Sequence, residues 1–277
     1  MKVSLPVINP HYISYQDTAP SQARASNVIE LPNGDHSEVV CVQSLCDEGA
    51  SEYLWKSMML YKQNSIPFGQ EPTPENEANG FVPDIIGDDL NKMAENIIRF
   101  EKLTGSQFPF IVVLNKSGEL IGCRFFSMPI GFQKETRKIL KSQGTNDPLV
   151  RHLKDLIDEV ESTSASAMTE RLLQKGRFPA RNGITPNLDN IWIAGGACVD
   201  KDYRGNGIVN QLLKLQARLI REHDCAYLVN GHDIANRPSS RAMDKMGYSK
   251  EYLTDLDFRT KFKGREYALR VLDLSVF

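Results

Sequence analysis

The residues with the clearest chemical potential form a short turn, Arg204-Gly205-Asn206-Gly207, between an apolar segment and an apolar helical pattern. The first amides of a helix have no intrahelical acceptor and carry the positive end of the helix dipole. Glycine lets a backbone approach a bound anion closely, and arginine adds a fork of donors. This order of residue types predicts an anion site at the start of the helix. A turn that binds nothing is the alternative interpretation.

The residue sequence of this turn excludes two known phosphate-binding signatures. The phosphate loop of NTPases requires GxxxxGK[ST], which the chain lacks. The dinucleotide fingerprint requires GxGxxG, whereas Gly207 is followed by Ile208, Val209 and Asn210. The turn therefore belongs to neither of these two classes.

The elements that must position the turn alternate between strand and helix patterns, which predicts an α/β fold. The turn follows a buried strand, IWIAGGACV (191–199), and opens a helix from Ile208 to about His223. A proline-rich, irregular arm is predicted over 1–36, and one domain over 37–277. The other predicted strands are residues 37–45, 108–115, 119–128, 225–232, 253–260 and 267–274, and the other predicted helices are residues 47–62, 89–104, 148–160, 165–175 and 237–246.

Composition narrows the class of protein. The 277 residues include 33 basic and 35 acidic side chains, a net charge of −2, which disfavours a large basic surface for nucleic acid. The five cysteines form no CxxC pair, so neither a disulfide framework nor a metal site is predicted. The longest apolar run, residues 110–114, is too short to span a membrane, and the start lacks the apolar core of a signal peptide. A cytoplasmic protein without membrane contact is expected, and its oligomeric state is not indicated.

Two motifs resemble those of the GNAT acetyltransferase superfamily. DYRGNGI, followed by an apolar helix, is similar to its acyl-CoA pyrophosphate loop, R/Q-x-x-G-x-G/A. About thirty residues later, NRPSSRAMDKMGY is similar to its second landmark, an Asn that leads into a short helix closing with K-x-G-F/Y. The order of elements from about Ser37 onward also fits. The resemblance implies a GNAT fold with a mixed central sheet of about seven strands, and extra helices at 147–175 inserted between the hairpin and the cofactor strand.

The resemblance also implies acetyl-CoA as co-substrate. The residues that would hold its phosphates are Arg204, Gly205, Asn206, Gly207, Ile208 and Val209. The backbone of Val199 would contact the pantetheine arm, an amide on the segment from Ala197 to Val199 would polarise the thioester carbonyl, and Asn236 matches the landmark asparagine. Val209 departs from the family pattern, which prefers Gly or Ala, so its side chain is expected to crowd the loop.

Within the superfamily, the chain is similar to the arylalkylamine (dopamine-type) N-acetyltransferases of insects, through CVDKDYRGNGI, SSRAMDKMGY and residues 68–72, FGQEP. The last match implies that Glu71 is the catalytic base, and the alternative is a solvated loop acid. Ser239 matches a family serine that would protonate the departing thiolate, and the alternative is a helix-capping serine. The tyrosine that many superfamily members use is replaced by Met243, and a second family serine by Ala235.

Two other candidates are read as structural. His232 and Asp233 are adjacent on a predicted strand, so their side chains point to opposite faces and a catalytic pair is not expected. Cys198 lies beside the proposed acetyl site, but a small buried strand residue is favoured over a nucleophile.

The segment 63–91 carries six carboxylates and neither Lys nor Arg. It would attract a cationic amine toward Glu71, or it is simply a solvated loop. Taken together, the motif resemblances imply an acetyl-CoA-dependent N-acetyltransferase that acts on a small primary amine, arylalkylamine or polyamine-like, by direct attack in a ternary complex. A protein or peptide N-acetyltransferase and a degenerate, non-catalytic acyl-CoA-binding module are the alternatives.

Overall fold

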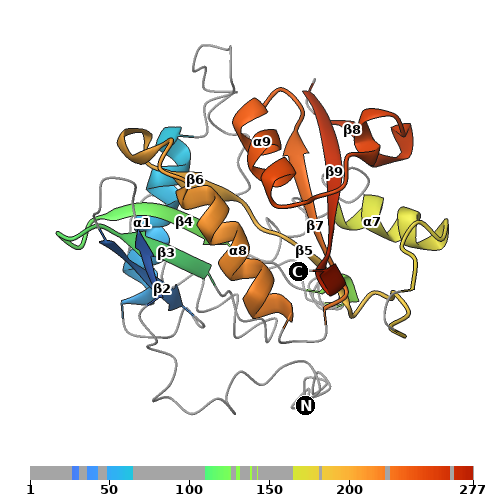
Figure 1. Ribbon diagram of the computed structural model, residues 1–277, viewed down its shortest axis with the longest axis horizontal. Coiled ribbons are helices and arrows are strands. Elements are labelled where there is room, and N and C mark those ends of the chain that lie inside the picture. Colours follow the sequence, from blue (N-terminus) through green and yellow to red (C-terminus); the bar gives the residue numbers. More distant parts are fainter. Residues whose placement is uncertain are drawn as a thin grey trace.

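The computed structural model of the protein describes residues 27–30, 36–42, 49–64, 110–125, 129–131, 138, 142, 165–180, 183–221, 225–262 and 265–276. In Figure 1 the strands fall into two groups, and helix α8 (Ile208–Arg221) crosses in front between them. The described residues include the glycine-rich turn, both elements that flank it, and the short helix of the second motif.

The first sheet is antiparallel throughout, with the order β1-β2-β3-β4-β6. Its strands are β1 (Asn27–Glu30), β2 (His36–Val42), β3 (Phe110–Leu114), β4 (Leu120–Phe125) and β6 (Ala197–Val199). The predicted hairpin joins β3 to β4, and Gly118 in its turn has a φ of 79°. β1 lies in the segment that the sequence predicts to be irregular. Its four residues show no strand pattern of their own, and pairing with β2 makes them a strand.

The second sheet is mixed, with the order β5-β7-β9-β8. Its strands are β5 (Ile191–Ile193), β7 (Tyr227–Asp233), β9 (Arg265–Asp273) and β8 (Arg259–Phe262). β5 and β7 are parallel, as the crossover through α8 between them requires. β7 pairs antiparallel with β9, and β9 pairs antiparallel with β8.

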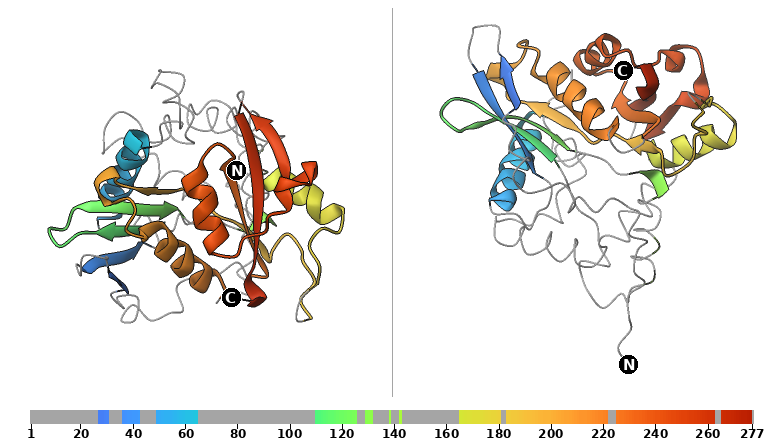
Figure 2. Two further views of the ribbon diagram at one scale, coloured as in Figure 1. Left: turned by 45° about the horizontal axis from the view of Figure 1, so that its top comes forward. Right: turned by 60° about the horizontal axis from the view of Figure 1, so that its bottom comes forward.

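Helices cover both faces of the first sheet, as Figure 2 shows. On one face, α1 (Ala50–Asn64) packs Leu54 and Met58 against Phe110 and Val112. On the other face, the first turns of α8 pack against Ile111 and the rest of a second apolar cluster. The continuous apolar run of β3 therefore reflects burial on both of its sides.

Helices cover both faces of the second sheet as well. α7 (Ala165–Gln174) packs on one face, with Met168 and Leu172 among the buried residues. α8 and α9 (Arg237–Lys245) share the other face, where Leu213 and Met243 meet Leu228 of β7. Short 3-10 helices occupy Lys201–Tyr203, Glu251–Leu253, Leu256–Phe258 and Leu274–Val276.

The α/β fold class is confirmed, but the described strands pair as two sheets rather than one. The predicted strand 191–199 is divided at residues 194–196. Ala194 still donates its amide to the Val229 carbonyl at 2.6 Å, whereas the Gly196 carbonyl already accepts from the Phe125 amide at 2.9 Å. Between them, Gly195 lies so close to the backbone of Phe125 that a Cβ atom there would collide with it. The chain therefore changes sheets at a position that only glycine can occupy.

Other predictions have mixed outcomes. α7 confirms the helix predicted at 165–175, and Gly176 closes it with a φ of 67°. The predicted helices at 89–104 and 148–160 lie outside the described residues. Among the helices that the structure describes, none has the length and apolar character needed to cross a membrane.

Candidate functional site

One edge of β6 pairs with β4, and the strand register determines which backbone groups lie on the opposite edge. The amide of Phe125 donates to the Gly196 carbonyl, and the amide of Asp200 donates to the Ile121 carbonyl, each at 2.9 Å. Cys198, which lies between them, is opposite Cys123. Hydrogen bonding alternates along a strand, so the backbone groups of Ala197 and Val199 are directed away from β4. These are the two residues that the sequence analysis assigns to the cofactor strand.

The edge of β7 beyond the end of β5 is exposed in the same way. The Val229 carbonyl accepts from Ala194 on the β5 side, and the Ile234 amide donates to Glu266 on the β9 side. By the same alternation, the backbone of Gly231 is directed to the side that β5 no longer covers. No described strand pairs with β6 on this side or with β7 at Gly231. Gly231 is a site residue that the sequence analysis missed, because only strand pairing reveals its direction.

The turn after β6 has the backbone conformation that its residue types predict. Asp200 caps the 3-10 helix by accepting the amide of Asp202 at 2.9 Å. Arg204 is extended and donates from Nε to the Val199 carbonyl at 3.3 Å. Gly205 and Gly207 have φ values of 83° and 77°, in the left-handed region that favours glycine. Both glycines are therefore required by the backbone conformation.

The start of α8 presents its first amides toward this turn. The first intrahelical bond runs from the Gln211 amide to the Gly207 carbonyl at 3.2 Å. The amides of Ile208, Val209 and Asn210 consequently have no acceptor within the helix, and Gly207 has no side chain to cap them. An anion at this position would accept their hydrogen bonds and interact favourably with the helix dipole.

Val209 was expected to crowd the loop. In the structure its side chain is half-buried and packs against the apolar clusters under α8, next to Ile208 and Leu213. Its bulk is thus directed at least partly into the core rather than into the turn.

The start of α9 carries the two predicted residues Asn236 and Ser239. The side chain of Asn236 is the helix N-cap and accepts the amide of Ser239 at 3.1 Å. The N-cap is therefore Asn236, and Ser239 lies in the first turn of the helix. Ser239 occupies the third position of the helix and is half-buried. Its proposed role as an acid remains a prediction.

Met243, at the position where many superfamily members have a tyrosine, is buried. Its sulfur accepts a hydrogen bond from Asn230 Nδ2 of β7 at 3.5 Å. Position 243 therefore supplies no proton donor, and any acid on α9 must come from another residue.

His232 is paired with a serine rather than with its neighbour Asp233. Its Nε2 lies 2.9 Å from Ser240 Oγ, while Asp233 Oδ1 accepts the amide of Ala235. Burial, followed by the charge of Arg270, lowers the pKa of His232 to about 4. The imidazole is therefore neutral at pH 7. The prediction that His232 and Asp233 do not form a pair is confirmed.

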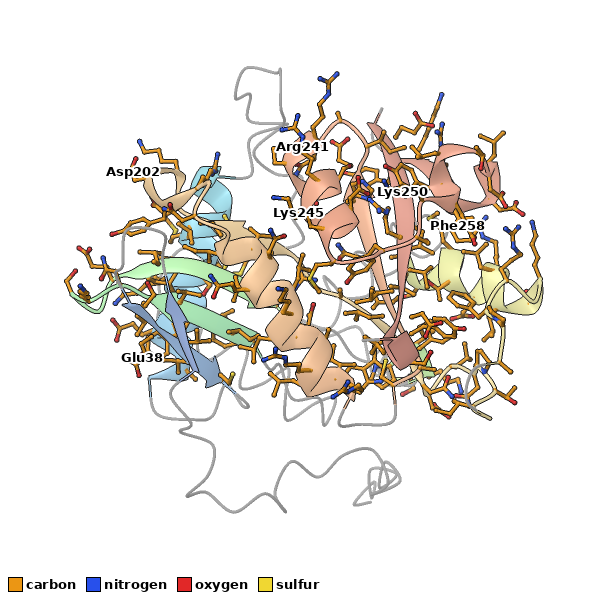
Figure 3. All side chains as sticks on the ribbon, in the orientation of Figure 1. Glu38, Asp202, Arg241, Lys245, Lys250 and Phe258 are labelled. Carbon is orange, nitrogen blue, oxygen red and sulfur yellow. The ribbon has the colours of Figure 1, made fainter. Side chains whose placement is uncertain are left out.

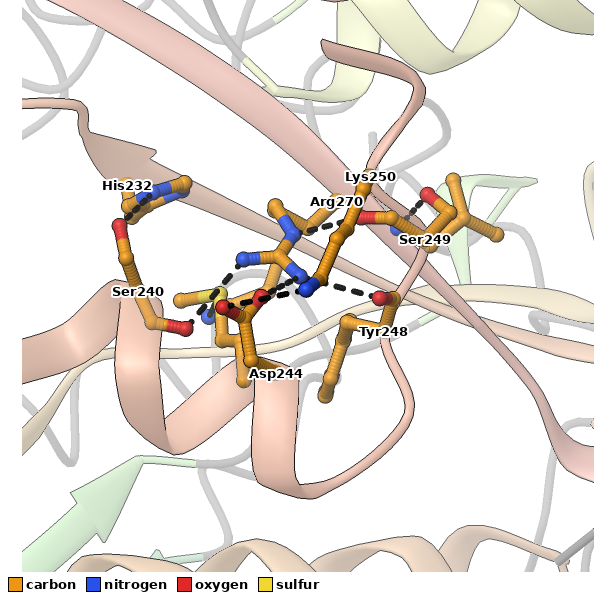
Figure 4. Close-up of polar contacts among 10 residues, drawn as sticks. His232, Ser240, Asp244, Tyr248, Ser249, Lys250 and Arg270 are labelled. Atoms are coloured by element: carbon orange, nitrogen blue, oxygen red, sulfur yellow. Dashed lines mark hydrogen bonds and ion pairs between the residues drawn. The ribbon is translucent and has the colours of Figure 1, made fainter. Parts of the chain in front are cut away.

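A buried arginine holds α9 on the sheet. Arg270 of β9 has no exposed surface, and Nη2 donates to Asp244 Oδ1 at 2.6 Å and to the Tyr248 carbonyl at 3.0 Å. Nε donates to the Ser249 carbonyl at 2.6 Å, and Nη1 to the Ser240 carbonyl at 3.4 Å (Figure 4). One side chain thus joins both ends of α9 to β9. The sequence offers no signal for it, since arginine is rarely buried.

Cys198 is a core residue. Its thiol contacts the Leu60 carbonyl of α1 at 3.5 Å, and burial raises its pKa to about 12. The thiolate that a nucleophile requires is therefore not formed at neutral pH, as the sequence analysis expects. Within the described part of the chain, no group of three or more His, Cys, Asp or Glu side chains could hold a metal ion. Glu71 and the acidic segment from residue 65 onward lie outside the described residues.

Comparisons with known proteins find similar solved structures but do not assign the chain to a family. No family model matches the chain, and no curated protein does. Among solved structures, ribosomal-protein-S5-alanine acetyltransferase from Vibrio fischeri is similar at 11% identity and a TM-score of 0.47, over 89% of this chain and 96% of that one. An N-acetyltransferase from Staphylococcus aureus Mu50 is similar at 14% identity and a TM-score of 0.43, over 86% and 98%.

An insect protein assigned as arylalkylamine N-acetyltransferase 7, from the yellow fever mosquito, is similar at 15% identity and a TM-score of 0.45, over 87% of this chain and 88% of that one. Identities and TM-scores this low do not establish a family for the chain. The assignment of the site therefore depends on its own strand register, turn conformation and helix start.

Proposed function

We propose that this protein is an acetyl-CoA-dependent N-acetyltransferase of the GNAT type. One observation supports the proposal most: the edge of β6 with which no described strand pairs leads directly into the turn that opens α8. The pantetheine arm of CoA is a linear chain with two amides, which can hydrogen-bond to a strand edge as an added strand does. Its pyrophosphate is an anion that suits the amides of Ile208, Val209 and Asn210, which have no acceptor within the helix.

The proposed reaction joins an amine nitrogen to the acetyl carbonyl carbon and breaks the bond from that carbon to sulfur. An amide of the Ala197–Val199 edge would stabilise negative charge that develops on the carbonyl oxygen. The motif resemblance assigns Glu71 as the base that removes a proton from the ammonium substrate, and Ser239 as the group that protonates sulfur. The resemblance also supports a small primary amine, arylalkylamine or polyamine-like, as acceptor.

A second function is favoured by Met243, because this buried thioether cannot protonate a leaving thiolate. The chain would then be an acyl-CoA-binding module that does not catalyse transfer.

Calorimetry with acetyl-CoA and thiol release over a panel of amines and basic peptides would distinguish three functions: the amine transferase, a peptide N-acetyltransferase and the module. Binding together with amine-dependent thiol release supports the transferase, and release only with peptides would instead identify a peptide N-acetyltransferase. Binding without turnover on either acceptor would favour the module. The absence of acetyl-CoA binding would eliminate all three.

A matched pair of glycine variants locates the binding site. Gly207→Val and Gly118→Val place a β-branched residue at φ values of 77° and 79°, and neither new Cβ has a neighbour within 4 Å. The backbone strain, about 1–2 kcal/mol, is thus comparable. Gly207→Val should weaken acetyl-CoA binding at least about tenfold beyond Gly118→Val, which lies in the hairpin turn. Equal binding by the two variants would place the phosphates elsewhere.

A further inference from the structure

The outward faces of α8 and α9 carry two stripes of basic residues. On α8 these are Lys214, Arg218 and Arg221, at spacings of four and three residues, and on α9 they are Arg237, Arg241 and Lys245, at spacings of four. Such spacings place side chains on one face of a helix. All six are exposed, and Figure 3 labels Arg241 and Lys245 on α9.

The two stripes face the same way. Leu213 and Ala217 of α8 and Met243 of α9 belong to one apolar cluster with Leu228 of β7, so both helices lie on the same face of the second sheet. Their opposite, exposed faces are therefore directed to the same side of the molecule, where Figure 1 shows α8 and α9 next to each other.

These cations have no carboxylate partner within the described structure. α8 contains no Asp or Glu, and the acid of α9, Asp244, is already paired with Arg270 and Lys250. No ion pair among the described residues involves any of the six. A chain with a net charge of −2 thus presents a cationic face formed by α8 and α9.

The stripes extend beyond the turn itself. At about 1.5 Å per residue, Lys214 lies about 9 Å and Arg218 about 15 Å along the axis from the start of α8. A phosphate bound by the first amides of the helix cannot contact both. A macromolecular anion is large enough to contact both residues. α8 and α9 contain no aromatic residue on which bases could stack, which disfavours single-stranded nucleic acid.

We propose that this face docks an acidic carrier protein that presents the acyl group as a thioester on a phosphopantetheine arm. The inference rests on the proposed function, because the arm would reach the edges of β6 and β7 that pantetheine is proposed to occupy. An acidic helix of the carrier would complement the two basic stripes. The amine attacks the carbonyl carbon, the bond from that carbon to the carrier's sulfur breaks, and the amine proton passes to that sulfur, which leaves the carrier with a free thiol.

The experiment compares acetylated carrier protein with acetyl-CoA as donor, by use of the full chain and one amine panel. Binding of the acetylated carrier is measured by calorimetry, and transfer by mass loss of the acetyl group. The test variant, Arg218→Glu/Lys245→Glu, reverses one charge on each stripe. The control variant, Arg171→Glu/Lys261→Glu, makes the same change in net charge at exposed residues of α7 and β8.

The test variant should raise the Kd for acetylated carrier at least about tenfold, because it places like charges opposite each other. The control variant should change this Kd less than about twofold, and neither should change the KM for acetyl-CoA more than about threefold. Transfer from acetyl-CoA with no binding of the carrier would overturn the docking proposal and leave the proposed function standing. Failure with both donors would overturn both. Carrier binding that is insensitive to Arg218→Glu/Lys245→Glu, or tight salt-dependent binding of an RNA oligonucleotide instead, would also overturn it.

Discussion

Replacement of Arg270 by methionine should destabilise the protein through the attachment of α9. The variant keeps an unbranched apolar side chain but removes the guanidinium, which donates to the Asp244 carboxylate and to the carbonyls of Ser240, Tyr248 and Ser249. The guanidinium also lies 4.9 Å from the centre of the Tyr252 ring. None of these partners acquires a new donor from methionine.

The burial of Arg270 and Asp244 determines how much unfolding free energy the variant loses. Loss of one partner of a buried ion pair costs about 3–5 kcal/mol. The Arg270 side chain is 0% exposed, but that of Asp244 is 37% exposed, so water can replace one of the lost contacts. We therefore expect the lower end of the range, about 3 kcal/mol of unfolding free energy. Since Asn236 and Ser239 lie at the start of α9, the variant should also lose transferase activity at temperatures where the wild type retains it.

Urea denaturation measures the free energy of unfolding of Arg270→Met, and Arg259→Met is a suitable control variant. Arg259 also donates to a carboxylate, Glu266, and to two carbonyls, those of Tyr252 and Leu253. Its side chain is 26% exposed and that of Glu266 is 42% exposed, so its replacement should cost about 1 kcal/mol or less from the ion pair. If Arg270→Met and Arg259→Met lower the free energy of unfolding equally, burial is not the source of the effect and the reasoning is refuted.

Three further predictions concern proton chemistry. Burial lowers the pKa of His232 from 6.5 to about 4, so the unfolded chain binds more protons than the folded chain between these pH values. The free energy of unfolding should therefore rise by about 3 kcal/mol from pH 4 to 6.5. Urea titrations at each pH measure this rise, and His232→Gln should reduce it. Cys198→Ala should keep kcat within about threefold in the thiol-release assay, because a thiol with a pKa of about 12 is not a nucleophile at neutral pH; a loss of about a hundredfold would contradict this. Glu71→Gln should lower kcat about 10²–10⁴-fold at pH 7, and less at high pH where the amine is already neutral, whereas a kcat that does not change would remove Glu71 as the base.

The sequence by itself determined the features that depend on local backbone preferences and periodicity. Gly205 and Gly207 have the left-handed φ values that a tight turn before a helix requires, and all but one of the buried residues of α8 are apolar, the exception being Gln216. The alternation rule also separated His232 from Asp233 correctly. Each of these inferences involves residues close together in the chain, whose geometry follows from φ, ψ and the helix or strand period.

The tertiary structure alone decided how distant segments meet. The change of sheets at Gly195 depends on contact with Phe125, seventy residues earlier in the chain. The direction of the Gly231 backbone depends on pairing with β9, β5 ends before it reaches this position, and the anchoring of α9 depends on Arg270, twenty-six residues after Asp244. The basic face likewise exists only because α8 and α9 pack on one side of the same sheet. Strand pairing and burial join residues that are far apart in sequence, so no local pattern records them.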